Sequence, residues 1–106
     1  MGTVTWSAQA KSDLYAIHDW IAASAPRTAE RFVADLVAAT ATWARHPKAG
    51  RLVPETGHDE RFRERFHGAY RIIYQPTGSG LRILTVISSH RRLSVGLPLP
   101  QLPDDL

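Results

Sequence analysis

The sequence predicts an α+β fold in the order β-α-α-β-β-β, in which an N-terminal helical hairpin packs on one face of a four-stranded, mainly antiparallel sheet. Three features predict it: apolar residues at helical spacing in the first half, alternating charged and apolar residues after position 59, and glycine-containing turns between strand-like runs. A chain of 106 residues has the size of one domain. We expect that domain to cover residues 1–93, followed by a tail at 94–106.

The first half of the chain predicts a strand followed by two helices. Residues 3–6 are β-branched and aromatic, and Ser7 after them is a favourable helix N-cap. Apolar residues recur at helical spacing up to position 21, and again from about 27 to 45 after a break at Pro26. The apolar stripes are Ala10, Leu14, Ile17 and Ile21, and then Phe32, Val33, Leu36, Val37 and Trp43. Because few residues separate the helices, they should form an antiparallel hairpin.

The second half predicts three consecutive antiparallel strands. Charged and apolar residues alternate from position 59 to Phe66, residues 70–75 are rich in strand formers, and residues 81–89 form the longest apolar run. The turns are expected at residues 67–68 and 77–80. The nearly continuous apolar character of residues 81–89 indicates burial on both faces, so this strand should lie inside the sheet. Three prolines between positions 98 and 103 exclude a helix or central strand from the tail.

Composition narrows the cellular setting and the type of partner. The chain has no cysteine, no apolar run of about 18 residues and no signal-peptide pattern, so we expect a cytoplasmic protein without disulfides, thiol chemistry or membrane association. The formal charge is only +3, but residues 51–95 carry eight arginines against four acidic residues. Arginine forms forked contacts with phosphates and carboxylates, which favours a polyanion or an acidic protein as partner. Alternatively, these arginines are solvated and paired with neighbouring acidic residues.

Three arginines alternate with two phenylalanines in the first strand of the second half. If Phe62 and Phe66 pack beneath the helices, the arginines face the open side of the sheet. The arginines would be about 6.6 Å apart, which is close to the spacing of successive phosphates on one nucleic-acid strand. Glu60 and Glu64 are the alternative partners of this row, which consists of Arg61, Arg63 and Arg65.

The order of several short motifs resembles one protein superfamily. The motifs are the Arg63-Glu64 step, the strand Tyr-Arg-Ile-Ile-Tyr at residues 70–74, the apolar last strand, and its ending His90-Arg91-Arg92. From about residue 3 to residue 93, the chain resembles the RelE/ParE superfamily of toxins from toxin-antitoxin systems. RelE-like members cleave messenger RNA in the ribosomal decoding site, whereas ParE-like members poison DNA gyrase, so the resemblance leaves two activities open.

Two features favour the ParE-like branch. Nucleases of the superfamily use lysine and a C-terminal tyrosine, yet this chain has only Lys11 and Lys48 and no tyrosine after Tyr74. Its long helical hairpin also resembles ParE-like members. The resemblance implies a growth-arresting, plasmid-stabilising gyrase inhibitor without catalytic residues, cofactor or metal, held in a hetero-oligomer by a cognate antitoxin with an acidic disordered segment. The residues for target or antitoxin binding should gather in one exposed cationic patch: Arg61, Arg63, Arg65, Arg71, Arg82, Arg91 and Arg92.

Two alternatives stay open. The first is a RelE-like, metal-independent endoribonuclease that depends on the ribosome and has messenger RNA as its substrate. In it, His90 acts as acid or base, although it could simply end its strand with a hydrogen bond, and the other members are Arg63, Glu64, Arg71 and Arg82. The second alternative is a non-toxic relic that only binds its antitoxin. The other histidines lack metal-ligand spacing, so no metal site is predicted.

Overall fold

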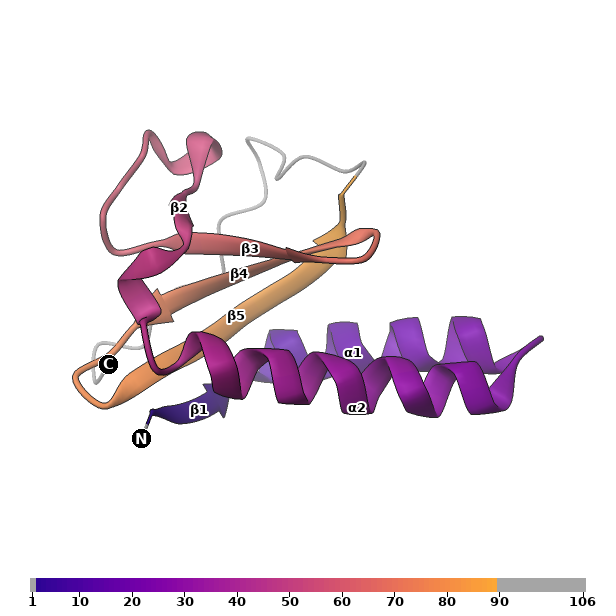
Figure 1. The fold of residues 1–106 in the computed structure, drawn as a ribbon. Coiled ribbons are helices and arrows are strands. Elements are labelled where there is room, and N and C mark those ends of the chain that lie inside the picture. Colours follow the sequence, from indigo (N-terminus) through magenta and orange to yellow (C-terminus); the bar gives the residue numbers. More distant parts are fainter. Residues whose placement is uncertain (1, 90–106) are drawn as a thin grey trace.

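The computed structural model describes residues 2–89 as two helices lying against one face of a sheet (Figure 1). The strands are β1 (Thr3–Trp6), β2 (Arg51–Leu52), β3 (Arg63–His67), β4 (Tyr70–Pro76) and β5 (Gly80–Ser88), and the helices are α1 (Ala8–Ala22) and α2 (Pro26–Trp43). Two short 3-10 helices, η1 (Pro47–Ala49) and η2 (Pro54–Thr56), flank β2. This order confirms the predicted α+β class. The predicted tail at 94–106, and the motif at residues 90–92, lie outside the described residues.

The sheet has the strand order β1-β5-β4-β3-β2. β1 pairs in parallel with β5, and the other three pairings are antiparallel. β5 is therefore internal, as its nearly continuous apolar sequence predicts. The predicted number of strands is one too low, because the two residues of β2 pair with β3. A two-residue strand is too short to show an alternating pattern, so the sequence carries no periodic signal for β2.

The two helices begin where the sequence predicts, within one residue. Pro26 occupies the first turn of α2, where its fixed φ and missing N–H cause no loss of a hydrogen bond. The predicted stripes are only partly buried: Leu36 is fully buried, whereas Val37 remains 46% exposed. Neither helix within residues 2–89 combines the length and apolar character that a membrane span requires.

Ser7 and Asp13 fix α1 against the sheet. The Ser7 hydroxyl oxygen accepts a hydrogen bond from the backbone N–H of Ala10 at 3.0 Å, which caps the helix as predicted. The same hydroxyl donates to the carbonyl oxygen of Leu84 in β5 at 2.8 Å. Further along α1, the Asp13 carboxylate accepts from the Thr85 hydroxyl at 2.5 Å and from a backbone N–H of β5 at 3.0 Å. The helix therefore cannot slide along β5 without breaking these bonds.

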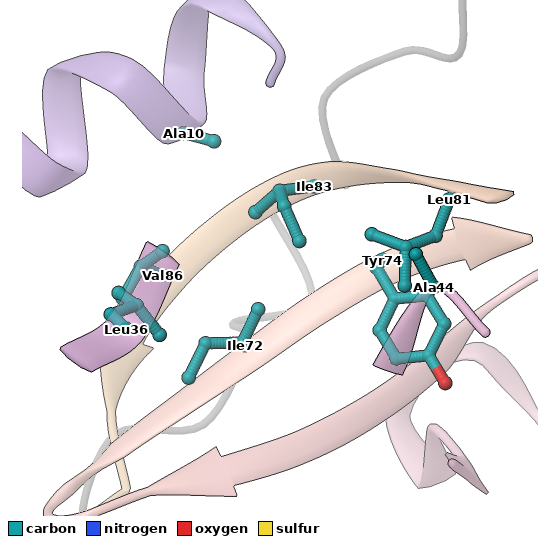
Figure 2. Packing of buried hydrophobic residues seen from close by; sticks show 8 residues of the cluster. All are labelled: Ala10, Leu36, Ala44, Ile72, Tyr74, Leu81, Ile83 and Val86. Carbon is teal, nitrogen blue, oxygen red and sulfur yellow. The ribbon is translucent and has the colours of Figure 1, made fainter. Parts of the chain in front are cut away.

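Two apolar clusters hold the layers together, one on each face of the sheet. On the face toward the helices, here called the helix side, residues of both helical segments pack against β4 and β5 (Figure 2). This cluster contains Ala10, Leu36, Ala44, Ile72, Tyr74, Leu81, Ile83 and Val86. On the opposite face, here called the far side, a smaller cluster consists of Val53, Phe62, Ile73 and Leu84. The segment 51–62 therefore covers part of the sheet face that the helices leave open.

Candidate functional site

The pleat of β3 separates its arginines from the phenylalanines, as alternation predicts, but the two faces are exchanged. Arg63 and Arg65 are opposite β4 residues of the helix-side cluster. Phe62 packs in the far-side cluster, and Phe66 lies on the same face as Phe62 and is 48% exposed. The expectation that Phe62 and Phe66 pack beneath the helices, with the arginines on the open face, is therefore wrong.

The position of the two helices explains this exchange. α1 packs mainly on β5, and α2 contacts β1. The helices therefore lie over the edge of the sheet that contains β1 and β5, away from the edge that contains β2. On the far side, Val53 offers Phe62 an apolar partner. A phenyl ring is more stable where other apolar groups bury it, so Phe62 lies on the far side and the arginines on the helix side.

Arg61, the first member of the predicted row, precedes β3 and turns back to Asp59. Its Nη2 lies 2.7 Å from Asp59 Oδ2, and its backbone N–H donates to Asp59 Oδ1 at 2.9 Å. The hydrogen bonds from Arg61 lower the pKa of the Asp59 carboxyl below its usual value. Arg61 is therefore an exposed residue whose charge is balanced by its own neighbour.

Arg71 lies on the far side in a network of two arginines and two glutamates, of which Arg51 is mostly exposed. Its Nη1 and Nη2 donate to the Glu55 carboxylate at 2.6 and 3.0 Å, and its Nε donates to Glu64 Oε1 at 3.1 Å. Glu64 also accepts from Arg51 Nε. The side chain of Arg71 is 7% exposed and that of Glu64 is 0% exposed. The Glu55 hydrogen bond, with the help of Glu64, raises the pKa of Arg71 despite the burial.

This network ties together three parts of the chain. Glu55 belongs to η2, Arg51 to β2, and Glu64 and Arg71 to the adjacent strands β3 and β4. A guanidinium buried with two carboxylates is stable only while those partners remain, because an isolated buried charge is strongly unfavourable. Arg71 is therefore a structural residue of the segment 51–56, with its charge fully balanced.

Arg63 and Arg65 lie on the helix side, close to the Tyr74 hydroxyl. Arg63 Nη1 donates to the carbonyl oxygen of Gly50 at 3.2 Å. The Nε atoms of both arginines are buried and have no hydrogen-bond partner. Among residues 2–89, no carboxylate lies within ion-pair distance of either guanidinium. These two arginines thus differ from Arg61 and Arg71, because the described chain supplies them with no counter-charge.

The Tyr74 hydroxyl is the polar group at the centre of this arrangement. It donates to the carbonyl oxygen of Pro47 in η1 at 2.6 Å, and the side chain is completely buried. Burial raises the pKa of the phenol, and the Gly50 backbone and the cations of Arg65 and Arg63 oppose this effect only in part. The phenol is therefore neutral at physiological pH and cannot balance the charge of the two arginines.

Arg82 lies apart from the other arginines. It alternates with Leu81 and Ile83 of the helix-side cluster, so it points to the far side, opposite Gln75. Ile87, the residue of β5 opposite Arg71, is five positions after Arg82, which corresponds to roughly 16 Å along the strand. The prediction of one exposed cationic patch is thus wrong for the described members, Arg61, Arg63, Arg65, Arg71 and Arg82. Arg91 and Arg92 lie outside the described residues, as does His90.

An apolar groove lies between the two helices of the hairpin. A cavity of about 340 Å³ lies between α1 and α2, lined by Leu14, Tyr15, His18, Glu30, Val33 and Ala34. Tyr15 is 68% exposed beside it. The sequence patterns do not single out Tyr15 and His18, but the width of the second apolar stripe is a signal. A stripe that includes both Phe32 and Val37, which lie about 140° apart around a helix, is wider than one buried face can use, so part of it faces outward.

The described residues include no group of three or more histidine, aspartate or glutamate side chains placed to hold a metal ion.

A family model with the description "ParE toxin of type II toxin-antitoxin system, parDE" matches residues 4–93. The chain belongs to this ParE toxin family. This confirms the superfamily that the motif order predicts, and the branch that the missing nuclease residues and the long helical hairpin favour.

A solved structure shares the fold of this family member. The structure is described as "Chromosomal ParDE TA system from P. aeruginosa", with 22% sequence identity and a TM-score of 0.64. The match covers 83% of the present chain and 96% of the other chain. At this identity the similarity establishes the arrangement of helices and sheet. No curated protein matches the chain significantly.

Proposed function

We propose that this ParE family toxin arrests growth by binding DNA gyrase through protein contacts, without a catalytic step. We further propose that a cognate antitoxin with an acidic, disordered segment neutralises it in a hetero-oligomer. Family membership supports a role as the toxin of a toxin-antitoxin pair. The observation that carries the choice between gyrase binding and RNA cleavage is the separation of the residues that a nuclease would need.

A metal-independent ribonuclease must place unbalanced cations around one scissile phosphate, where negative charge develops in the transition state. Arg71 and Glu64 are buried against each other on the far side, and Arg63 points to the helix side of the same sheet. Arg82 is also on the far side, but it lies roughly 16 Å along β5 from Ile87, the residue opposite Arg71. This separation gives a phosphate no common binding point among these four residues, and it supports a toxin that acts by contact.

The antitoxin contact draws support from two surfaces. The groove between α1 and α2 offers apolar side chains, including the exposed Tyr15, to an amphipathic segment. Arg63 and Arg65 offer positive charge to its acidic residues. A segment that folds on binding can cover both surfaces, because it gains apolar burial as it becomes ordered. The solved relative comes from a ParDE toxin-antitoxin system, and we extend that pairing to this chain.

Induction of the chain in bacteria tests the proposed target. We expect growth arrest, an SOS response and double-strand DNA breaks, together with loss of supercoiling activity when the purified protein is added to gyrase. Primer extension on cellular messages should show no cuts in phase with codons. Codon-phased cuts without SOS induction would establish the ribonuclease instead, and normal growth at full expression would establish the relic.

A pair of variants tests the arginines after β5. Arg91→Ala combined with Arg92→Ala should reduce growth arrest at equal protein level, because these two arginines are part of the proposed target contact. Arg45→Ala, at an exposed position after α2, is the matched control and should leave arrest unchanged. Equal toxicity of all three proteins would remove residues 91 and 92 from the proposed site.

A further inference from the structure

From the geometry of β3 we infer that Arg63 and Arg65 bind two alternate carboxylates of an extended acidic peptide on the helix side of the sheet. The inference rests on the proposed function in one respect, since the peptide would be the acidic segment of the antitoxin. It also divides the arginines predicted from the sequence: these two serve binding, whereas Arg71 serves the fold.

The first support is the incomplete hydrogen bonding of both side chains. The Nε of Arg63 and the Nε of Arg65 are buried without a partner, while buried polar groups in folded proteins are almost always paired. Both side chains are half-buried, so their guanidinium groups are held beside the protein surface instead of extending freely into solvent. The acceptors that residues 2–89 give these guanidinium groups, the Gly50 carbonyl and the Tyr74 hydroxyl, are neutral, so a carboxylate would be their first charged acceptor.

The second support is charge. Arg51, Arg61 and Arg71 each contact a carboxylate within the described chain, whereas Arg63 and Arg65 have none. Their polar neighbours, the Gly50 carbonyl and the Tyr74 phenol, are neutral. Two adjacent like charges in a half-buried position repel each other, and a partner with two carboxylates would remove this repulsion.

The third support is spacing. Residues two positions apart on a strand are about 6.6 Å apart, and the same distance separates alternate residues of an extended peptide. A Glu-X-Glu segment therefore matches the pair without bending. At the end of β3, the ring of Phe32 lies 5.9 Å from that of His67 and 5.2 Å from that of Tyr70, and all three residues are half-buried. These rings offer a neighbouring apolar contact for the same peptide.

Nucleic acid fits this row less well than a peptide does. The affinity of a protein for nucleic acid depends largely on the number of phosphates that its lysines and arginines neutralise. The other described arginines of the predicted set do not extend the row, because Arg61 and Arg71 are neutralised and Arg82 points to the opposite face. Two carboxylate contacts combined with apolar burial are sufficient for a peptide, whereas two phosphate contacts give little affinity.

The test uses a fluorescein-labelled decapeptide that alternates glutamate and leucine, with a glutamine-leucine peptide as the uncharged control. Binding to the full chain is measured by fluorescence anisotropy. The double variant Arg63→Gln and Arg65→Gln should bind the acidic peptide roughly tenfold more weakly. Arg82→Gln is the matched control, because its Nε is also buried and unpaired but faces the far side, and it should bind within about twofold of wild type.

Arginine Nε–Hε NMR resonances of the wild-type protein provide a measurement that does not depend on any variant. The acidic peptide should shift the resonances of Arg63 and Arg65 and leave that of Arg71 in place. Shifts confined to Arg82 would overturn the inference, as would equal binding of the Arg63 and Arg65 variant. Tighter binding of a thymidine oligonucleotide of equal charge at the same two resonances would also overturn it, in favour of nucleic acid.

The failure of this inference can be distinguished from the failure of the proposed function. If antitoxin expression rescues growth equally for wild type and for the Arg63 and Arg65 variant, the inference is overturned and the toxin function stands. If the wild-type chain causes no arrest but its Arg63 and Arg65 resonances still respond to the acidic peptide, the binding site stands and the toxin function fails.

Discussion

Glu64→Gln is the substitution that tests the buried charge network most directly. The Glu64 carboxylate is fully buried; its Oε1 accepts hydrogen bonds from Nε and Nη2 of Arg71, and its Oε2 accepts one from Nε of Arg51. Glutamine has almost the same shape, but one of its oxygens becomes an NH₂ group that faces an arginine donor. The network then changes from two positive and two negative charges to an excess of one positive charge.

The size of the effect follows from which partners remain. Removal of one member of a buried ion pair costs about 3–5 kcal/mol. Here Glu55 keeps its two hydrogen bonds to Arg71, and the side chain of Arg51 is 62% exposed and can be hydrated. We therefore expect a loss of about 3 kcal/mol, at the low end of that range. For a domain of this size, this corresponds to a fall in Tm of roughly 12–24 °C.

Urea denaturation and thermal unfolding of purified variants measure this loss. Arg51→Gln should cost clearly less than Glu64→Gln because Arg51 is mostly exposed, and Arg61→Gln should leave Tm unchanged because its ion pair is at the surface. A loss below about 1 kcal/mol for Glu64→Gln would show that the network contributes little and that the reasoning is wrong.

Three further variants test the other contacts that position the site. Ser7→Ala should cost about 2 kcal/mol in urea unfolding, because it removes a helix cap and the bond to the Leu84 carbonyl; a loss near zero would contradict this role. Asp13→Ala should cost about 2 kcal/mol and speed amide exchange at the end of β5, whereas unchanged exchange would disprove the link between α1 and β5. Tyr74→Phe should cost about 1 kcal/mol by leaving the Pro47 carbonyl unpaired. Because burial raises the pKa of Tyr74 in the folded state, the wild-type protein should lose stability as the pH rises above 10, and the variant should not. The difference between their free energies of unfolding should therefore narrow. A constant difference would contradict the direction of the pKa shift.

The features that the sequence predicts well depend on neighbours along the chain. Ser7 caps α1 because the N–H groups of the next turn lie beside it in any helix that starts there. Pro26 starts α2 because its φ angle suits the first turn. The turn at 77–80 also forms as expected, closed by a hydrogen bond from Thr77 N–H to the Gly80 carbonyl. Local rules are sufficient for these elements.

The orientation of β3 could not be predicted in this way. Alternation assigns its side chains to two faces, but it does not say which face lies under the helices. That choice depends on Val53, which comes from a short segment without periodicity and covers Phe62 on the far side. Position 53 gave no sign of this role, because a single valine between a two-residue strand and a 3-10 helix has no pattern around it.

The roles of the arginines also depend on distance along the chain. Arg61 pairs with Asp59 two positions earlier, so the alternative of neighbouring ion pairs could have been assigned from the sequence. Arg71 pairs with Glu55, sixteen positions earlier, and only the fold brings them together. A count of charges is therefore informative about the kind of partner but not about which arginines are available to bind it.

The network around Arg71 connects the fold to the proposed activity. The helices cover only one face of the sheet, so the far side needs another cover, and the segment 51–56 supplies it through Val53 and the ion pairs of Glu55. A guanidinium that holds this cover in place must stay between its two carboxylates, whereas a catalytic cation must meet the phosphate without them. Arg71 cannot do both at once. The same contacts thus stabilise the far side and keep Arg71 from binding a phosphate. Arg63 and Arg65 remain as the described strand cations on the helix side that are able to meet an anionic partner.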